Sequence, residues 1–210
     1  MHRQSYPVAT GSDSKIIVIE YDAGSKTAGK DLATAIANEH SIDHLDVVVA
    51  NAGIMNGSDL TKDAEPENIM EHLTINTLGP ILLYQGCAPL LNQSKQEPKL
   101  FIISSAAGSN TLIDDFPLPL VAYGMSKAAT NFAAGKMHRE EERIVVVPVH
   151  PGWVQTAMGA TAAAIVGMDA KEIPVTLEDS VSGLLKVFDA ATKKDYSGKF
   201  LEQNNEMVPW

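Results

Sequence analysis

The feature that most constrains the fold is a set of short apolar runs, each about the length of one strand, spread along the chain. They are rich in β-branched residues and do not alternate with polar ones, so they predict strands covered on both faces. The expected strands are Lys15–Tyr21, Leu45–Ala50, Lys99–Ile103 and Ile144–His150, followed by a short one at Gly198–Leu201. Helical patterns separate these runs. The alternation predicts a doubly wound α/β fold, a parallel sheet with helices on both faces, whose last four strands are neighbours in chain order.

The helices are predicted from apolar residues that recur at helical spacing between the strands. Pro66 opens a long helical segment, because the first turn of a helix does not need the N–H that proline lacks. The other expected helices are Thr27–His40, a helix that contains Tyr123 and extends to about His138, and Glu178–Thr192. The segment 160–174 is expected to form a lid.

Length and composition indicate one domain, residues 1–210, because no linker or block of charge divides the chain. The net charge of -10 argues against a nucleic-acid partner. Cys87 is the single cysteine and lies in an apolar segment, which excludes an intrachain disulfide and favours a buried thiol in a reducing compartment. We find no membrane-spanning run, no signal-peptide pattern and no metal-ligand spacing among the histidines, so we expect a cytoplasmic protein without a metal.

Tyr123 and Lys127 are the first candidates for chemistry, because their spacing places both side chains on one face of a helix, one turn apart. A nearby ammonium favours the phenolate, so we expect Lys127 to lower the pKa of Tyr123 and make it a proton donor or acceptor. The same spacing also occurs on ordinary amphipathic helices. The pair therefore needs further residues that converge on it.

Asn76 is a second candidate, because Pro80 follows it four residues later in the same helical segment. Proline has no N–H to donate to the Asn76 carbonyl, so a kink is expected there. The carbonyl and the amide side chain of Asn76 would then be available to water or a ligand. A simple bend that accommodates packing is the alternative.

Small and polar residues follow the predicted strands at the end where parallel sheets bind their ligands. They are Asp22, Asn51, Ser104 and Ser105, and the pair Pro151 and Gly152. Because the carboxyl ends of parallel strands meet at one edge of the sheet, these residues should lie near one another. The sequence therefore predicts an active site at this edge.

The ordered set Asn51-Ala52-Gly53, Asn76, Ser105, Tyr123-x-x-x-Lys127 and Pro151-Gly152 resembles the short-chain dehydrogenase/reductase family. Each motif is common, but the set in this order is specific. The segment His150-Pro-Gly-Trp-Val-Gln-Thr156 and the ending Pro209-Trp210 are similar to those of sniffer-like and C-factor-like carbonyl reductases, including fungal norsolorinic acid ketoreductases. The resemblance implies a Rossmann-like fold and NADP(H)-dependent reduction of a small-molecule carbonyl, such as an aromatic ketone or a polyketide.

The resemblance also implies a role for each matching residue. Tyr123 would donate the proton, Lys127 would lower its pKa and bind the nicotinamide ribose, and Ser105 would hold the carbonyl oxygen, with Ser104 as the alternative. Asn76 would hold a relay water. The implied cofactor-binding residues are Asp22, Asn51, Ala52, Gly53, Tyr123, Lys127, Pro151, Gly152, Val154 and Thr156.

The start of the chain departs from the family pattern, because the first βαβα segment and its glycine-rich pyrophosphate turn are not present. Relative to the family the chain is therefore truncated, and the strand Lys15–Tyr21 would lack neighbours unless it pairs with Leu45–Ala50. We expect negligible NADPH turnover from these 210 residues and recovery when the segment is added. Two alternatives stay open: a degenerate homologue that acts as a binding or scaffold protein, within a homodimer for example, and a cofactor-independent acid/base enzyme.

Overall fold

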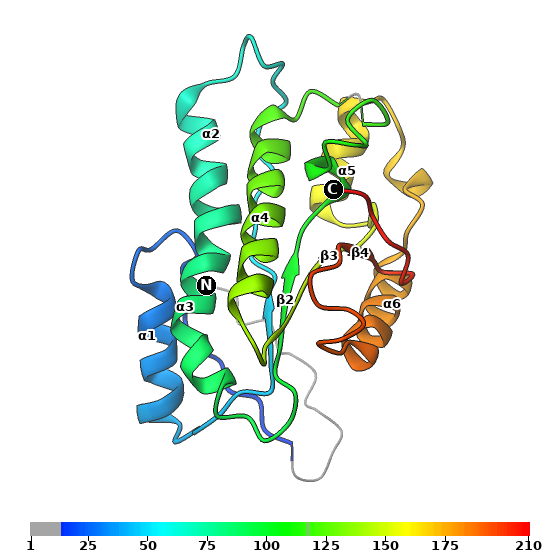
Figure 1. The fold of residues 1–210 in the computed structure, drawn as a ribbon. Helices are drawn as coiled ribbons and strands as arrows, with labels where there is room; N and C mark the ends of the chain where they lie inside the picture. Colours follow the sequence, from blue (N-terminus) through cyan, green and yellow to red (C-terminus); the bar gives the residue numbers. More distant parts are fainter. Residues whose placement is uncertain (1–13, 117) are drawn as a thin grey trace.

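A computed structural model describes residues 14–116 and 118–210 of the chain. In these residues a parallel sheet of four strands runs in the order β1-β2-β3-β4 (Figure 1). The strands are β1, Val47–Ala50; β2, Lys99–Ile103; β3, Val145–His150; and β4, Leu201–Glu202. Val48 lies opposite Leu100, and Leu100 lies opposite Val146. The predicted strand order and fold class are confirmed.

The four predicted helical segments form helices in the structure, and α5, Ala157–Ile165, which was not predicted, adds another that overlaps the segment expected to form a lid. They are α1, Ala28–Thr34; α2, Pro66–His72; α3, Gly79–Leu91; α4, Val121–Glu140; α5, Ala157–Ile165; and α6, Leu177–Ala190. Two π-helical turns extend this set, η1 at Ala35–Glu39 and η2 at Leu73–Leu78, with short 3-10 helices η3 at Ala106–Gly108 and η4 at Ala170–Glu172. None of the helices in the described residues is long and apolar enough to cross a lipid bilayer.

Two apolar cores, one on each face of the sheet, hold the layers together. On one face, alternate residues of β1, β2 and β3 pack against α3 and α4. On the other, the intervening residues of β2 and β3 pack against α6, where Phe101 stacks on Phe188 with ring centroids 4.0 Å apart. Figure 1 shows α1, α3 and α4 on one side of the strands and α6 on the other. Because both faces of β3 are covered, its apolar run is continuous.

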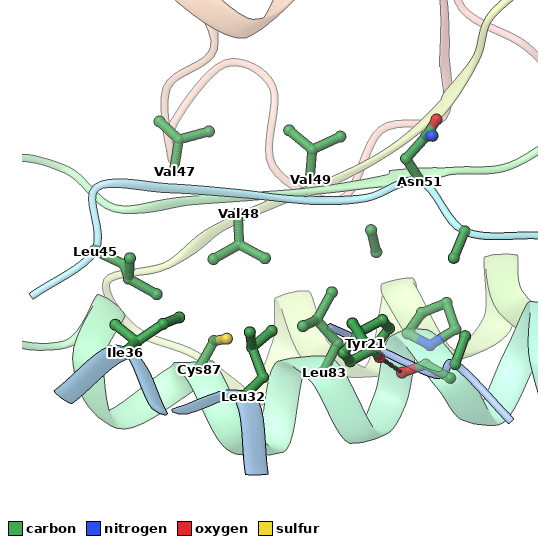
Figure 2. A pocket seen from close by; sticks show the side chains of 15 residues that line it. Tyr21, Leu32, Ile36, Leu45, Val47, Val48, Val49, Asn51, Leu83 and Cys87 are labelled. Atoms are coloured by element: carbon green, nitrogen blue, oxygen red, sulfur yellow. Dashed lines mark hydrogen bonds between the residues drawn. The ribbon is translucent and has the colours of Figure 1, made fainter. Parts of the chain in front are cut away.

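β1 is covered on one face only. Val48 and Ala50 are buried against α3, whereas Val47 is 47% exposed and Val49 is 39% exposed. Figure 2 shows Val47 and Val49 on one side of the strand and Val48 on the other. A cavity of about 350 Å³ lies beside this strand. Leu32, Leu83 and Cys87 line that cavity. In the described residues β1 pairs with β2 alone, so its second edge borders this cavity.

The predicted strand Lys15–Tyr21 is wrong, because residues 14–22 form no strand in the structure. Val18 is exposed, whereas Tyr21 packs against the core beside β1 and lines the edge cavity. A β-branched run becomes a strand only when a neighbouring strand accepts its backbone hydrogen bonds. The pattern correctly indicated an apolar segment, but it could not show whether a neighbouring strand would pair with it.

The last strand begins later than predicted. Gly198 has a φ of +80°, a left-handed conformation, and its N–H donates to the Val146 carbonyl oxygen over 2.8 Å. It therefore belongs to the turn that approaches β3, and the pairing of β4 begins at Leu201, opposite Val149.

Candidate active site

Tyr123 and Lys127 lie in the first two turns of α4, as predicted, and meet the carboxyl end of β2. The Lys127 Nζ lies 5.7 Å from the centroid of the Tyr123 ring and donates a hydrogen bond of 2.7 Å to the carbonyl oxygen of Ile103, the last residue of β2. Lys127 is buried. The ammonium thus ties α4 to the end of the strand from which Ser105 continues.

The pKa of Tyr123 moves in the direction opposite to our expectation. Burial raises the pKa of the Tyr123 phenol, and the Ser105 side chain acts weakly against that rise. Burial lowers the pKa of Lys127 to about 8, because a buried ammonium loses hydration. At neutral pH Tyr123 is therefore a protonated phenol, the form that donates a proton, and Lys127 keeps its charge.

Ser105 and Ser104 have different environments, although they are adjacent. The Ser105 hydroxyl caps η3 and accepts a hydrogen bond of 3.2 Å from the Ala107 N–H, which leaves its own hydrogen available. The Ser104 hydroxyl is buried and donates to the side-chain oxygen of Asn131. Of the two serines, Ser105 is the one that acts to lower the pKa of Tyr123, against the larger effect of burial.

Asn76 connects the segment after β1 to α4. Its side-chain oxygen accepts from the Ile54 N–H at 2.8 Å, and its Nδ2 donates to the Ile54 carbonyl and to the Ser126 hydroxyl, each at 2.9 Å. Ser126 in turn donates to the Tyr123 carbonyl oxygen at 2.7 Å. The Asn76 amide is therefore two hydrogen bonds from the Tyr123 backbone.

The Asn76 carbonyl has a protein partner that the sequence did not indicate. It lies in the π-helical turn η2, and Pro80 in the next turn has no N–H to offer. The Thr130 hydroxyl of α4 lies 2.8 Å from this carbonyl oxygen and 2.8 Å from the Ser126 carbonyl oxygen, so the two carbonyls share its one hydrogen. The relay water that we expected at Asn76 stays a prediction.

Two glycines bring backbone segments close to Lys127. A Cβ at Gly53 would lie 3.1 Å from the Asn76 Oδ1 and 3.6 Å from the Lys127 Nζ. A Cβ at Gly108 would lie only 2.6 Å from the Lys127 carbonyl carbon, so η3 packs against α4 more closely than any side chain would permit. Gly53 thus places the segment after β1, with Asn51 and Ala52, beside the ammonium.

Among the described residues, no hydrogen bond joins the remaining predicted cofactor-binding residues to Tyr123, Lys127 or Asn76. Asp22 accepts the Gly24 N–H in a turn, and its neighbours Tyr21 and Ala23 line the edge cavity together with Asn51 and Ala52 (Figure 2). Pro151 and Gly152 follow β3, and Gly152 has a φ of +82°. Val154 pairs with Val175, and the Thr156 hydroxyl caps α5. The hydrogen bonds of Thr156 therefore serve its own segment.

Sequence reasoning missed two histidines. His72 is fully buried, with its ring 6.4 Å from that of Tyr123 at an angle of 80°. Burial lowers the pKa of His150, at the end of β3, to about 4, and its Nδ1 has no partner among the described residues. The spacing of His72 and Asn76, one turn apart, was the available signal. Among the described residues no group of three or more His, Cys, Asp or Glu is placed to hold a metal ion.

Comparison with known proteins identifies the family of this chain. Residues 7–165 match the family described as short chain dehydrogenase. The chain is 34% identical over 205 residues to norsolorinic acid ketoreductase of Aspergillus parasiticus, covering 97% of this chain and 74% of that protein.

Two solved structures share the fold over most of this chain. NADPH-bound carbonyl reductase from chicken fatty liver has a TM-score of 0.80 and 29% identity, covering 92% of this chain and 77% of that one. Carbonyl reductase Sniffer of D. melanogaster has a TM-score of 0.78 and 25% identity, covering 91% and 77%. The chain therefore belongs to the short-chain dehydrogenase family.

Proposed function

We propose that this site reduces the carbonyl group of a small molecule, an aromatic ketone or a polyketide-like compound, to an alcohol, with NADPH as the reductant. The observation that carries the proposal is geometric: the Tyr123 ring lies 5.7 Å from the Lys127 Nζ, and Lys127 is bound to the Ile103 carbonyl at the carboxyl edge of the sheet, from which Ser105 continues. The substrate class is supported by the relative named norsolorinic acid ketoreductase.

The proton chemistry uses two hydroxyl groups of this chain. Ser105 has its oxygen engaged by the Ala107 N–H, so its hydrogen can be donated to the substrate's carbonyl oxygen. Tyr123 transfers its proton to the same oxygen as negative charge develops there, and the Lys127 ammonium stabilises the phenolate that remains. NADPH, when bound, supplies the hydride that reaches the carbonyl carbon. One hydride and one proton together account for the alcohol.

The residues present fit the nicotinamide end of the cofactor. Lys127 has three ammonium hydrogens, and the Ile103 carbonyl accepts one of them, so others can be donated to ribose hydroxyls. Gly53, which lacks a side chain, leaves room beside that ammonium. The same edge of the sheet carries Asn51 and Ala52, which follow β1, and Pro151 and Gly152, which follow β3. NADP(H) as the cofactor is supported by the NADPH-bound chicken carbonyl reductase.

Binding of the cofactor's pyrophosphate is expected to be weak, because we find no glycine-rich turn in the sequence. Each charge-assisted hydrogen bond to a phosphate contributes about 1.5–3 kcal/mol, so two or three missing bonds weaken binding by several orders of magnitude. We therefore expect the activity to emerge when a βαβα segment with that turn precedes the chain, and to be negligible without it.

The test is NADPH oxidation with an aromatic ketone or a quinone, measured on the 210-residue chain and on a version extended by such a segment. The extended protein should oxidise NADPH, and Tyr123→Phe should reduce its kcat by about 10²-fold or more. Tyr196→Phe is the matched control, since Tyr196 packs in the core beside α6.

Binding is measured separately by NADPH fluorescence. An extended protein that binds NADPH but turns over equally well with Tyr123→Phe would overturn the role of Tyr123. If the extended protein does not bind NADPH at all, the degenerate binding or scaffold protein becomes the better account. Robust turnover by the unextended chain would show that other residues hold the pyrophosphate.

A further inference from the structure

Three polar side chains on α2 and η2, which we call the polar ladder, bind the backbone that follows β1. They are Asn68, His72 and Asn76, and their spacing of four residues places them on one face of the helix. Asn76 binds both backbone groups of Ile54, and His72 accepts the Asn56 N–H at 3.1 Å. The Asn68 Nδ2 lies 3.4 Å from the Asn56 carbonyl and 3.1 Å from the Asp59 carboxylate.

The two hydrogen bonds of His72 require one tautomer. Its Nδ1 lies 2.8 Å from the Asn68 carbonyl oxygen, which can only accept, so Nδ1 carries the hydrogen. Its Nε2 then has a free lone pair, which accepts the Asn56 N–H. The ring is fully buried and both of its nitrogens are satisfied, so the imidazole has one orientation and one hydrogen position.

His72 also packs against the catalytic tyrosine. The two rings meet edge to face, with centroids 6.4 Å apart at 80°. The segment that His72 holds is fitted closely to the helix, since a Cβ at Gly57 would lie 2.8 Å from the Asn68 Nδ2. His72 therefore contacts the backbone on one side of the site and Tyr123 on the other.

We propose that His72, in its Nδ1–H tautomer, is a positioning residue that fixes the segment 54–59 against the Tyr123 ring and so sets the separation between that segment and the proton donor. The proposal rests on the proposed function, because it concerns the same site. Without the imidazole acceptor the Asn56 N–H would be left without its partner, and the segment would move to find another. Such a displacement disturbs the orientation of reacting groups more than it disturbs substrate binding.

The experiment compares His72→Phe, which keeps a ring against Tyr123 but has no acceptor, with His72→Gln, which offers both an acceptor and a donor. The first readout is hydrogen exchange of the Asn56 amide, which needs no cofactor. We expect exchange about tenfold faster or more in His72→Phe and within about threefold of the parent in His72→Gln. The control is His44→Gln, a partly exposed histidine bonded to Asp43, which should change nothing.

The second readout is the kinetics of the extended protein. His72→Phe should lower kcat by about tenfold with KM changed less than about threefold, and His72→Gln should restore most of kcat. Because kcat is expressed per folded molecule, a loss of folded protein alone would leave it unchanged in both variants. Unchanged Asn56 exchange in a folded His72→Phe protein overturns the proposal.

A measurement on the unmutated protein decides the matter even if His72→Phe does not fold. Nitrogen-15 chemical shifts of the imidazole distinguish its tautomers, and we expect His72 to carry its hydrogen on Nδ1. A hydrogen on Nε2 would contradict the proposal, because that nitrogen could not accept from Asn56. Normal Asn56 protection in an extended protein that binds NADPH but does not oxidise it would overturn the proposed function alone.

Discussion

β3 and β1 begin with the same residues, three consecutive valines, yet their environments differ. Val145, Val146 and Val147 of β3 are all fully buried, whereas in β1 only the middle valine, Val48, is buried and its two neighbours are exposed. β3 has a strand on each side and a helix layer on each face, whereas β1 borders the edge cavity. The burial of a strand therefore depends on its neighbours, and a valine run indicates only that a strand is suited to burial.

The candidate site likewise has one part at the centre of the sheet and one part at its edge. Ser105 and Lys127 lie at the end of β2, where strands on both sides hold the backbone in place. The segment after β1 has a strand on one side only, and side chains of the polar ladder hold it instead. Side-chain hydrogen bonds thus replace, on the edge side, the support that neighbouring strands give in the centre.

The largest loss of stability is expected from a substitution in β3, which has a strand on each side. Val147→Ala removes two methyl groups from a fully buried position in the core against α6, so it should lower the free energy of unfolding by about 2–3 kcal/mol. Urea denaturation of the parent and the variant measures it. A loss below about 0.5 kcal/mol would mean that β3 is not packed as described.

A smaller effect is expected from pH, through His150 at the end of β3. Its folded pKa of about 4 lies below its ordinary value, so the folded state binds fewer protons than the unfolded chain between pH 4 and 6.5. The stability associated with the neutral His150 imidazole is fully present above the unfolded pKa. The free energy of unfolding then decreases as pH falls through this window, by at most about 1.4 kcal/mol per pH unit. His150→Gln should remove this component, which is read as the difference between the two stability profiles; parallel profiles would contradict the burial of this imidazole.

The smallest effect is expected at the edge. Val47→Ala, the counterpart of Val147→Ala on β1, removes a side chain that is 47% exposed, so the free energy of unfolding should change by less than about 0.5 kcal/mol. The same urea titration measures it. A loss equal to that of Val147→Ala would break the comparison, because it would show that another surface covers Val47 in solution.

Much of this architecture could be predicted from periodicity and strand order. The runs at β1, β2 and β3 and the helical spacing around Tyr123 are local patterns, and they indicated the right elements. The choice between Ser104 and Ser105 could not be made in this way, because it depends on which hydroxyl Asn131 binds from the next helix. The run at residues 15–21 failed for the related reason that strand pairing is not a local property.

The sequence by itself determined the order of the four strands and indicated the carboxyl edge of the sheet, with Tyr123, Lys127 and Asn76, as the candidate site. These follow from spacing along the chain, which backbone geometry converts into faces and edges. Only the tertiary structure decided the direction in which burial moves the pKa of Tyr123, the partner of the Asn76 carbonyl and the hydrogen bonds of His72. Burial and hydrogen-bond geometry depend on which distant segments meet, and no pattern within one segment contains that information.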